Sequence, residues 1–209
     1  MNTSNIKRYA PQARNDFIAA MRKQAAKYGI TADRILPAEQ KGDLLLIGET
    51  VFPLSVLKPR EKLIKRIQAS SFEQTIDYIA YSWFNRLCAI RYMECKGLLD
   101  HGRRVLSSAD GSAGLPQILE ECLDIDLPGL NASRVAELKL DGNKDEELYR
   151  ELLLAQCHAL NQVMPLLFEQ VSDESELLLP DNLTKTDSLI RYLVSSIPEE
   201  DWSDVQIIG

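Results

Sequence analysis

The stretch SFEQTIDYIAYSWFNRLCAIRYMECKG, residues 71–97, predicts one long helix. Ser71 is followed three residues later by Gln74, which is a capping-box pattern, and Gly97 is typical of a helix end. Two apolar stripes recur at helical spacing: Phe72, Ile76, Ile79, Trp83, Leu87 and Ile90 in one, and Tyr78, Tyr81, Cys88 and Tyr92 in the other. A helix that is apolar on several sides belongs inside a packed structure, so we expect it to be the buried central helix.

Shorter patterns on either side of this helix predict a mainly α fold. Helices are expected over residues 11–28, 60–70, 117–123, 145–164 and 188–197, with a last one opening at Pro198. The apolar run DLLLIGETVF, broken by Gly48, predicts at most a small β-hairpin near residues 43–52. Residues 107–116 and 172–182 are expected to be loops. The predicted fold is therefore a helical domain with a long buried central helix.

Composition places the chain among ordinary globular proteins. Its 209 residues are 45% hydrophobic and 26% charged, enough for one sizeable domain or two small ones. The chain has no apolar run of the roughly 20 residues that cross a bilayer, and its opening MNTSNIKRYA has no secretory core. We expect no membrane contact, a cytoplasmic location, and four reduced cysteines, because none of them forms a CxxC pair.

Charge is divided unevenly along the chain. Residues 1–104 hold 18 Lys/Arg and 10 Asp/Glu, whereas residues 105–209 hold 6 and 21, for a net charge of −7 overall. A sub-division near 103–115 would separate a basic part, 1–102, from an acidic part, 116–209. The basic part is suited to phosphate. Alternatively, the two parts attract each other, or the charges only keep the protein soluble.

The densest cationic segment lies before the long helix. Five cations fall within nine residues: Lys58, Arg60, Lys62, Lys65 and Arg66. On a helix, four of them follow i, i+4, i+7, i+8 spacing and share a face that could run along DNA phosphates without recognising bases. The alternatives are a solvated basic face, or one that pairs with the acids of the second half.

Motifs for catalysis are missing from the sequence. His101 and His158 lie far apart and have no partner at a recognised metal-ligand spacing. The chain also lacks GxSxG, GxxxxGK[ST], any Gly-x-Gly and any Pro-Pro pair. We therefore expect no catalytic, cofactor-binding or metal-ligating residue within these 209 residues.

Three separated segments carry a resemblance to a known family. They are residues 2–30, 79–99 and 178–209, and the most specific block is IAYSWFNRLCAIRYMECKGLL at 79–99. Within it, the family-motif core consists of Trp83, Phe84, Asn85, Arg86 and Arg91. The chain resembles the N-terminal region of PglX proteins, the adenine-specific DNA methyltransferases of bacteriophage-exclusion (BREX) systems.

The resemblance implies a role as the non-catalytic N-terminal helical region, 1–209, of a larger enzyme. In such an enzyme the S-adenosylmethionine and adenine motifs lie downstream, so this part would bind no cofactor while the whole enzyme uses S-adenosylmethionine to modify adenine at N6. The apolar residues Val205, Ile207 and Ile208, with no helix stop beyond Gly209, lead us to expect further chain. The implied partners are DNA through the whole enzyme, other BREX proteins and the enzyme's own methyltransferase domain. The alternative is a free-standing helical protein–protein adaptor without a DNA role.

Overall fold

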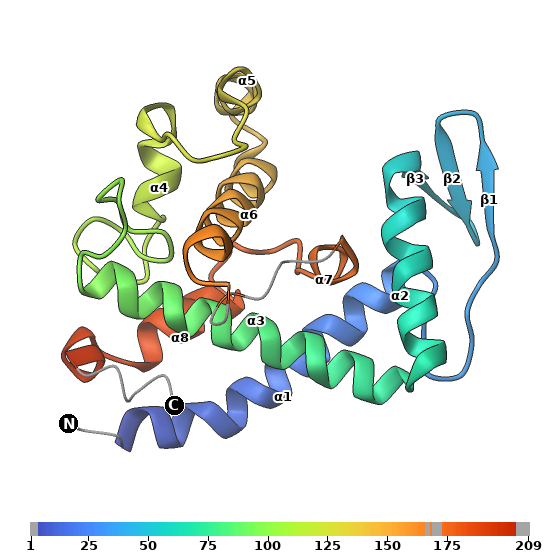
Figure 1. The fold of residues 1–209 in the computed structure, drawn as a ribbon, viewed down its shortest axis with the longest axis horizontal. Coiled ribbons are helices and arrows are strands. Elements are labelled where there is room, and N and C mark those ends of the chain that lie inside the picture. Colours follow the sequence, from blue (N-terminus) through green and yellow to red (C-terminus); the bar gives the residue numbers. More distant parts are fainter. Residues whose placement is uncertain (1–3, 166–167, 169–172, 204–209) are drawn as a thin grey trace. The chain divides into compact units, whose positions relative to one another are not determined.

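The computed structural model describes residues 4–165, 168 and 173–203, which form a mainly helical fold with one small sheet (Figure 1). The helices are α1 (Ser4–Lys27), α2 (Leu57–Ala69), α3 (Phe72–Cys95), α4 (Gln117–Glu120), α5 (Ala132–Asp141), α6 (Asp145–Val163), α7 (Asp173–Leu177) and α8 (Leu189–Ser196). The strands are β1 (Ala38–Lys41), β2 (Leu44–Ile47) and β3 (Thr50–Pro53), and the 3-10 turns are η1 (Leu54–Val56), η2 (Cys122–Asp124) and η3 (Glu199–Ser203). The predicted mainly α class is confirmed. None of the described helices has the combined length and apolar character of a membrane span.

The long helix α3 forms where the sequence predicts it. The Ser71 Oγ accepts a hydrogen bond from the Gln74 backbone N–H at 3.1 Å and so caps its first turn. The stripe from Phe72 to Ile90 is buried throughout. The second stripe is not, because Tyr78 and Tyr81 are 43% and 67% exposed. Residues 86–91 are all buried, so the helix is covered on every side there and along one side only in its first half.

The chain divides into two compact units whose boundaries fall within α1 and α3. Unit 1 comprises Met1–Arg14, Trp83–Gln170 and Asp181–Gly209, and unit 2 comprises Asn15–Ser82 and Val171–Pro180. The change of charge near 103–115 lies inside unit 1, so the units and the charge halves divide the chain differently. Unit 2 holds 10 Lys/Arg and 11 Asp/Glu, because it combines the basic α2 with the acidic segment that contains α7. The basic first half of the sequence is thus not a basic unit of the structure.

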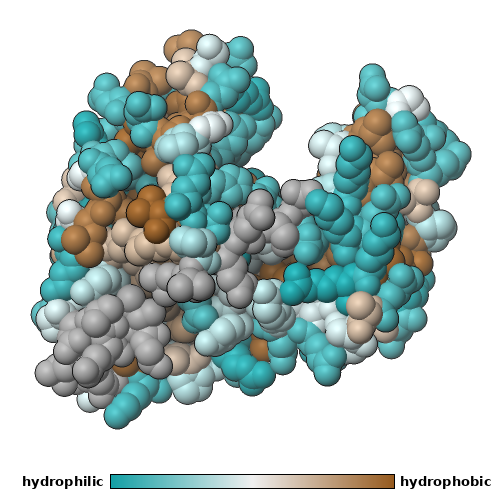
Figure 2. All heavy atoms as spheres, viewed as in Figure 1, coloured by the Kyte–Doolittle hydropathy of each residue, from teal (hydrophilic) through white to brown (hydrophobic). Residues whose placement is uncertain are grey.

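Unit 2 contains the sheet, in which the strands pair antiparallel in the order β1-β2-β3. The predicted hairpin corresponds to β2 and β3, with Leu45 opposite Phe52, and β1 adds a strand that the sequence did not indicate. Leu45, Ile47 and Phe52 are buried, and the Phe52 ring centroid lies 5.2 Å from that of Tyr28. Hydrophobic residues are visible between α2 and the sheet, while hydrophilic residues form most of this unit's visible surface (Figure 2).

Gly29 follows α1 and lies beside this sheet, at a position where a side chain would not fit. Its φ is +70°, in the left-handed region that favours glycine at helix ends. A Cβ at this position would lie 2.7 Å from the Ile47 Cγ2 atom. A glycine therefore ends the first helix and also permits close packing.

The core of unit 1 includes the buried aromatic residues Trp83 on α3, Tyr149 on α6 and Trp202 on η3. Helices α4 and α5 both pack against α6. Helix α8 is capped by Ser188, whose Oγ accepts a hydrogen bond from the Arg191 backbone N–H at 3.1 Å. This core carries the loop of residues 103–116, which is central to the candidate site.

The first helix is longer than predicted. It begins at Ser4 rather than at residue 11, and Pro11 lies inside it. Proline removes one helical hydrogen bond. The buried residues Tyr9, Ala13 and Phe17 follow one another at i, i+4 spacing across Pro11, so packing on both sides of the proline retains the helix.

Three further segments differ from expectation. Helix α5 was not anticipated, although the Asn131 side chain caps it by accepting a hydrogen bond from the Arg134 backbone N–H. Helix α7 lies within the predicted loop 172–182 and contributes the buried Leu177. The last predicted helix is the 3-10 turn η3, and the unfinished apolar pattern at 205–208 lies outside the described residues.

Candidate functional site: a buried ion-pair network and a basic helix

The WFNRL block contributes to the core of unit 1. Trp83 is fully buried, and Arg86 is only 4% exposed, with its guanidinium carbon 5.3 Å from the Trp83 ring centroid. The half-buried Phe84 has its ring centroid 6.4 Å from that of Tyr9, and Asn85 is also half-buried. These residues have a packing role in the structure.

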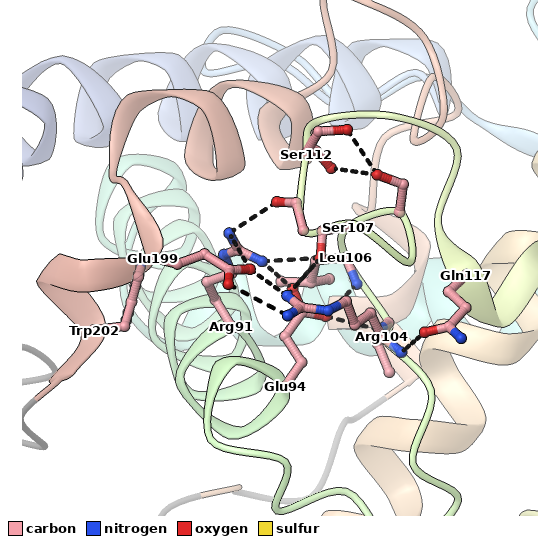
Figure 3. A network of polar contacts seen from close by, with 12 residues as sticks. Arg91, Glu94, Arg104, Leu106, Ser107, Ser112, Gln117, Glu199 and Trp202 are labelled. Atoms are coloured by element: carbon pink, nitrogen blue, oxygen red, sulfur yellow. Dashed lines mark hydrogen bonds and ion pairs between the residues drawn. The ribbon is translucent and has the colours of Figure 1, made fainter.

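Arg91, the remaining residue of the motif, forms a buried ion pair with Glu94 one helical turn later. Their side chains are 1% and 0% exposed, and Arg91 Nη1 lies 2.6 Å from Glu94 Oε1. The Ser107 hydroxyl donates to the same Oε1 at 2.9 Å, and Oε2 accepts the backbone N–H groups of Val105 and Leu106 at 2.7 and 2.8 Å (Figure 3). Glu94 therefore accepts four hydrogen bonds, which compensate for its removal from water.

The network continues from Arg91 to η3. Arg91 Nη1 donates to Ser107 Oγ at 2.9 Å, and Nη2 donates to the Gly111 carbonyl at 3.3 Å. The same Nη2 lies 3.4 Å from Glu199 Oε1, and Arg104 also pairs with Glu199 (Figure 3). One carboxylate from η3 is thus shared by an arginine of α3 and an arginine of the loop.

Two further contacts hold this loop in place. The buried Tyr149 hydroxyl donates to the Val105 carbonyl at 2.8 Å. Arg191 on α8 donates to the Ala113 carbonyl near the other end of the loop. The loop of residues 103–116 is consequently attached to α3, α6, α8 and η3. The network's function in this geometry is to fix a loop that has almost no secondary structure of its own.

A polar cavity of about 520 Å³ opens beside the network. It is lined by Glu94, Cys95, Lys96, Gly97, Leu99, Gly102, Arg103, Arg104, Ala109 and Gln117. Arg103 is paired with Glu121 at 2.9 Å, and Arg104 with Glu199. Both guanidinium groups of the cavity wall are therefore already neutralised by carboxylates of the same unit.

The histidines and cysteines form no reactive cluster within the described part of the chain. No group of three or more potential metal ligands comes together there. His101 Nδ1 accepts the Arg103 backbone N–H at 3.0 Å, so its Nε2 carries the proton and donates to Gln156 Oε1 at 2.7 Å. Burial raises the pKa of the Cys88 thiol to about 12, and burial is also the main cause that raises the pKa of Cys95 to about 11. Thiols with such pKa values are poor nucleophiles at neutral pH.

The five cations predicted to form a DNA-contacting face divide into two groups. Arg60 is 3% exposed, and its Nε donates to the Tyr28 carbonyl at 2.8 Å. Arg66 pairs with Glu174 of α7 at 3.2 Å and lies 4.1 Å from the Tyr78 ring centroid. Both arginines therefore hold unit 2 together. Attraction between the basic and acidic parts, one of the alternatives, occurs at this ion pair.

The three lysines of the segment are exposed. Lys58, Lys62 and Lys65 lie on α2 at i, i+4, i+7 spacing and share one face of the helix. The structure thus separates a lysine face, defined by these three residues, from the two structural arginines.

Sequence reasoning identified Arg91 only through the motif and missed its partners. The sequence feature that could have revealed the network is Glu94, because an acid three residues after a basic residue on an otherwise apolar helix indicates an ion pair. Ser107, Arg104 and Glu199 lie 13, 10 and 105 residues from Glu94 in sequence, and no spacing rule connects them.

Comparison with known proteins gives two relatives that match the whole chain. It is 53% identical over 216 aligned residues to the adenine-specific methyltransferase BrxX of Escherichia coli O9:H4 (strain HS), of which it covers 18%. It is 29% identical over 233 aligned residues to the adenine-specific methyltransferase PglX of Lacticaseibacillus casei (strain Zhang), of which it covers 19%. No family model matches the chain.

The chain thus spans less than a fifth of the length of these curated relatives. The matched region covers the whole of this chain. The resemblance that the sequence indicated is confirmed: over its whole length this chain is similar to a part of the adenine-specific methyltransferases BrxX and PglX.

Proposed function

We propose that these 209 residues are the N-terminal, non-catalytic module of an adenine-specific (N6) DNA methyltransferase of a BREX phage-defence system. The end-to-end similarity to BrxX, at 53% identity, is the observation that carries the proposal. The whole enzyme would take its methyl group from S-adenosylmethionine. Among the described residues, the buried Arg91–Glu94 pair and its loop contacts are features suited to a supporting module.

The module's first task in this proposal is to brace the methyltransferase core. Bracing requires a surface whose loops do not rearrange when they are contacted. The contacts from Glu94, Tyr149 and Arg191 to the loop of residues 103–116 give unit 1 this property. The same fixed surface is suited to contact with other BREX proteins.

The second task is a sequence-independent contact with DNA through the lysine face. Lys58, Lys62 and Lys65 present three ammonium groups on one side of α2. Ammonium groups bind phosphate oxygens as point charges and carry no base information, so this face would hold DNA without selecting its sequence. Binding of this kind releases counterions and therefore weakens steeply with salt.

Charge reversal in the full-length enzyme tests the DNA contact. Lys58→Glu, Lys62→Glu and Lys65→Glu together should weaken binding to unrelated duplexes by similar factors and lower the log–log salt slope by about 2 to 3, because each lost phosphate contact removes about 0.9. The matched control reverses the exposed lysines Lys7, Lys96 and Lys185 of unit 1 and changes the net charge equally. An equal loss in both variants would show that only the overall charge matters, and unchanged affinity in the first would remove DNA contact from the proposal.

A further inference from the structure

The small sheet of unit 2 has an apolar middle strand whose side chains point to both faces. Its middle strand reads LLLI over Leu44–Ile47, where a half-buried strand would alternate apolar and polar residues. The inner face contains Leu45 and Ile47, which are buried with Phe52. A continuous apolar run of this kind is typical of strands that are covered on both sides.

The register places a second apolar set on the opposite side. Leu44 pairs with Pro53 and Leu46 pairs with Val51, and residues directly opposite each other in an antiparallel pair point to the same side. Glu39 and Lys41 of β1 lie on the same side, opposite Leu46 and Leu44. We call the four apolar residues the outer sheet face. Leu44 and Val51 are 50% and 56% exposed, Pro53 is exposed and Leu46 is half-buried. Contiguous exposed apolar residues, unlike a single one, indicate an interaction site.

The residues around the outer sheet face favour contact with the face rather than with the edges. At one edge, Lys41 of β1 lies 3.5 Å from Glu39 of the same strand, and charged side chains on an edge discourage strand addition. At the other edge, β3 ends in Pro53, which has no N–H to donate to a further strand. Glu39 and Lys41 also point to the same side as the outer sheet face, so they form a polar rim beside its apolar centre, as in many protein interfaces.

We propose that the outer sheet face is covered by an apolar segment of the same, longer polypeptide, from outside these 209 residues. This inference rests on the proposed function. The relatives' length supports it, since more than four fifths of each relative lies outside the part that the chain matches. A segment of the same polypeptide is also present at high effective concentration, which allows a small apolar contact to persist. A second copy of the chain is disfavoured, because stable dimers use about 20 to 30 residues on each side rather than four.

Site-specific photo-crosslinking in the full-length protein tests the proposal. A diazirine amino acid replaces Val51 in one sample and Leu140, 88% exposed on α5, in the control. Mixed light- and heavy-isotope protein separates crosslinks within a chain from those between chains. We expect position 51 to crosslink within its own chain to a peptide beyond residue 209. Crosslinks between copies, or reaction with solvent only, would overturn the proposal.

A second variant tests whether the contact contributes to stability. Val51→Lys places a charge in the outer sheet face and should lower the full-length protein's melting temperature by several degrees, whereas Leu140→Lys should leave it unchanged. Equal melting temperatures for the two variants would contradict the proposal. Methyl transfer to adenine is measured separately on the full-length protein without substitutions. If no methyl transfer is found, the proposed function is refuted, whereas the crosslinking result stands.

Discussion

Replacing Arg91 with methionine should strongly destabilise unit 1. Methionine fills much of the same space but removes the partner of Glu94, whose side chain is 0% exposed. Glu94 would keep the hydrogen bonds from Ser107, Val105 and Leu106. It would lose the positive charge that Arg91 places beside its carboxylate. Removing one member of a buried pair typically costs about 3–5 kcal/mol because it leaves an uncompensated buried charge.

The assay is urea unfolding of the 209-residue chain, followed by tryptophan fluorescence. Trp83 and Trp202 are both buried in unit 1 and report on the same unit as the substitution. The matched control is Arg134→Met, because Arg134 is 42% exposed while it pairs with Glu147 and Glu151. Exposed pairs of this kind contribute about 0–1 kcal/mol, so the control should change the free energy of unfolding little.

A double variant separates loss of charge from loss of packing. Adding Glu94→Gln to Arg91→Met removes the unpaired charge, so the double variant should lose less stability than the two single losses added together. Hydrogen exchange at the Val105 and Leu106 amides should accelerate in Arg91→Met before unit 1 unfolds globally. A loss below about 1 kcal/mol for Arg91→Met, similar to Arg134→Met, would refute the reasoning that the buried pair fixes this loop.

Three more predictions follow from the same geometry. Trp83→Ala should lower the free energy of unfolding by about 3–5 kcal/mol, measured by chemical denaturation with circular dichroism, and a loss near zero would contradict the burial of this ring. Gly29→Ala should cost at least about 1 kcal/mol in the same measurement, because it adds left-handed strain and a contact with Ile47; an unchanged midpoint would show that the turn adapts. Burial raises the pKa of Tyr149 well above 10.0, so the stability of the neutral phenol is present below pH 10 and is lost as pH rises beyond it. Tyr149→Phe should therefore weaken this alkaline loss while costing about 1–3 kcal/mol at pH 7, since the Val105 carbonyl loses its donor; identical alkaline profiles would oppose this assignment.

The sequence predicted the elements whose signal is local. The stripe that includes Trp83 has helical spacing, and the Ser71 cap needs only the next three residues, so α3 could be located with no tertiary information. The hairpin in residues 44–53 follows in the same way from an apolar run interrupted by Gly48. Strand β1 reads AEQK and has no apolar alternation, so only its pairing with β2 makes it a strand.

The candidate site depended more on contacts between distant segments. A run of five cations predicted a basic face shared by four of them, but Arg60 donates to backbone carbonyls and Arg66 pairs with Glu174. The three lysines stay on the surface, because the ammonium group of lysine is strongly hydrated and sits on a flexible stem. Similarly, Glu199 reaches Arg104 across 95 residues of sequence, a contact that only the folded chain defines.

Methyl transfer measured on two forms of the protein tests whether the 209 residues are a non-catalytic part of an adenine methyltransferase. The full-length protein and the 209-residue chain are each incubated with DNA and labelled S-adenosylmethionine, and N6-methyladenine is quantified in the recovered DNA. We predict methyladenine with the full-length protein and none above background with the 209-residue chain. Methylation by the 209-residue chain alone, or no adenine methylation by the full-length protein, would contradict the account.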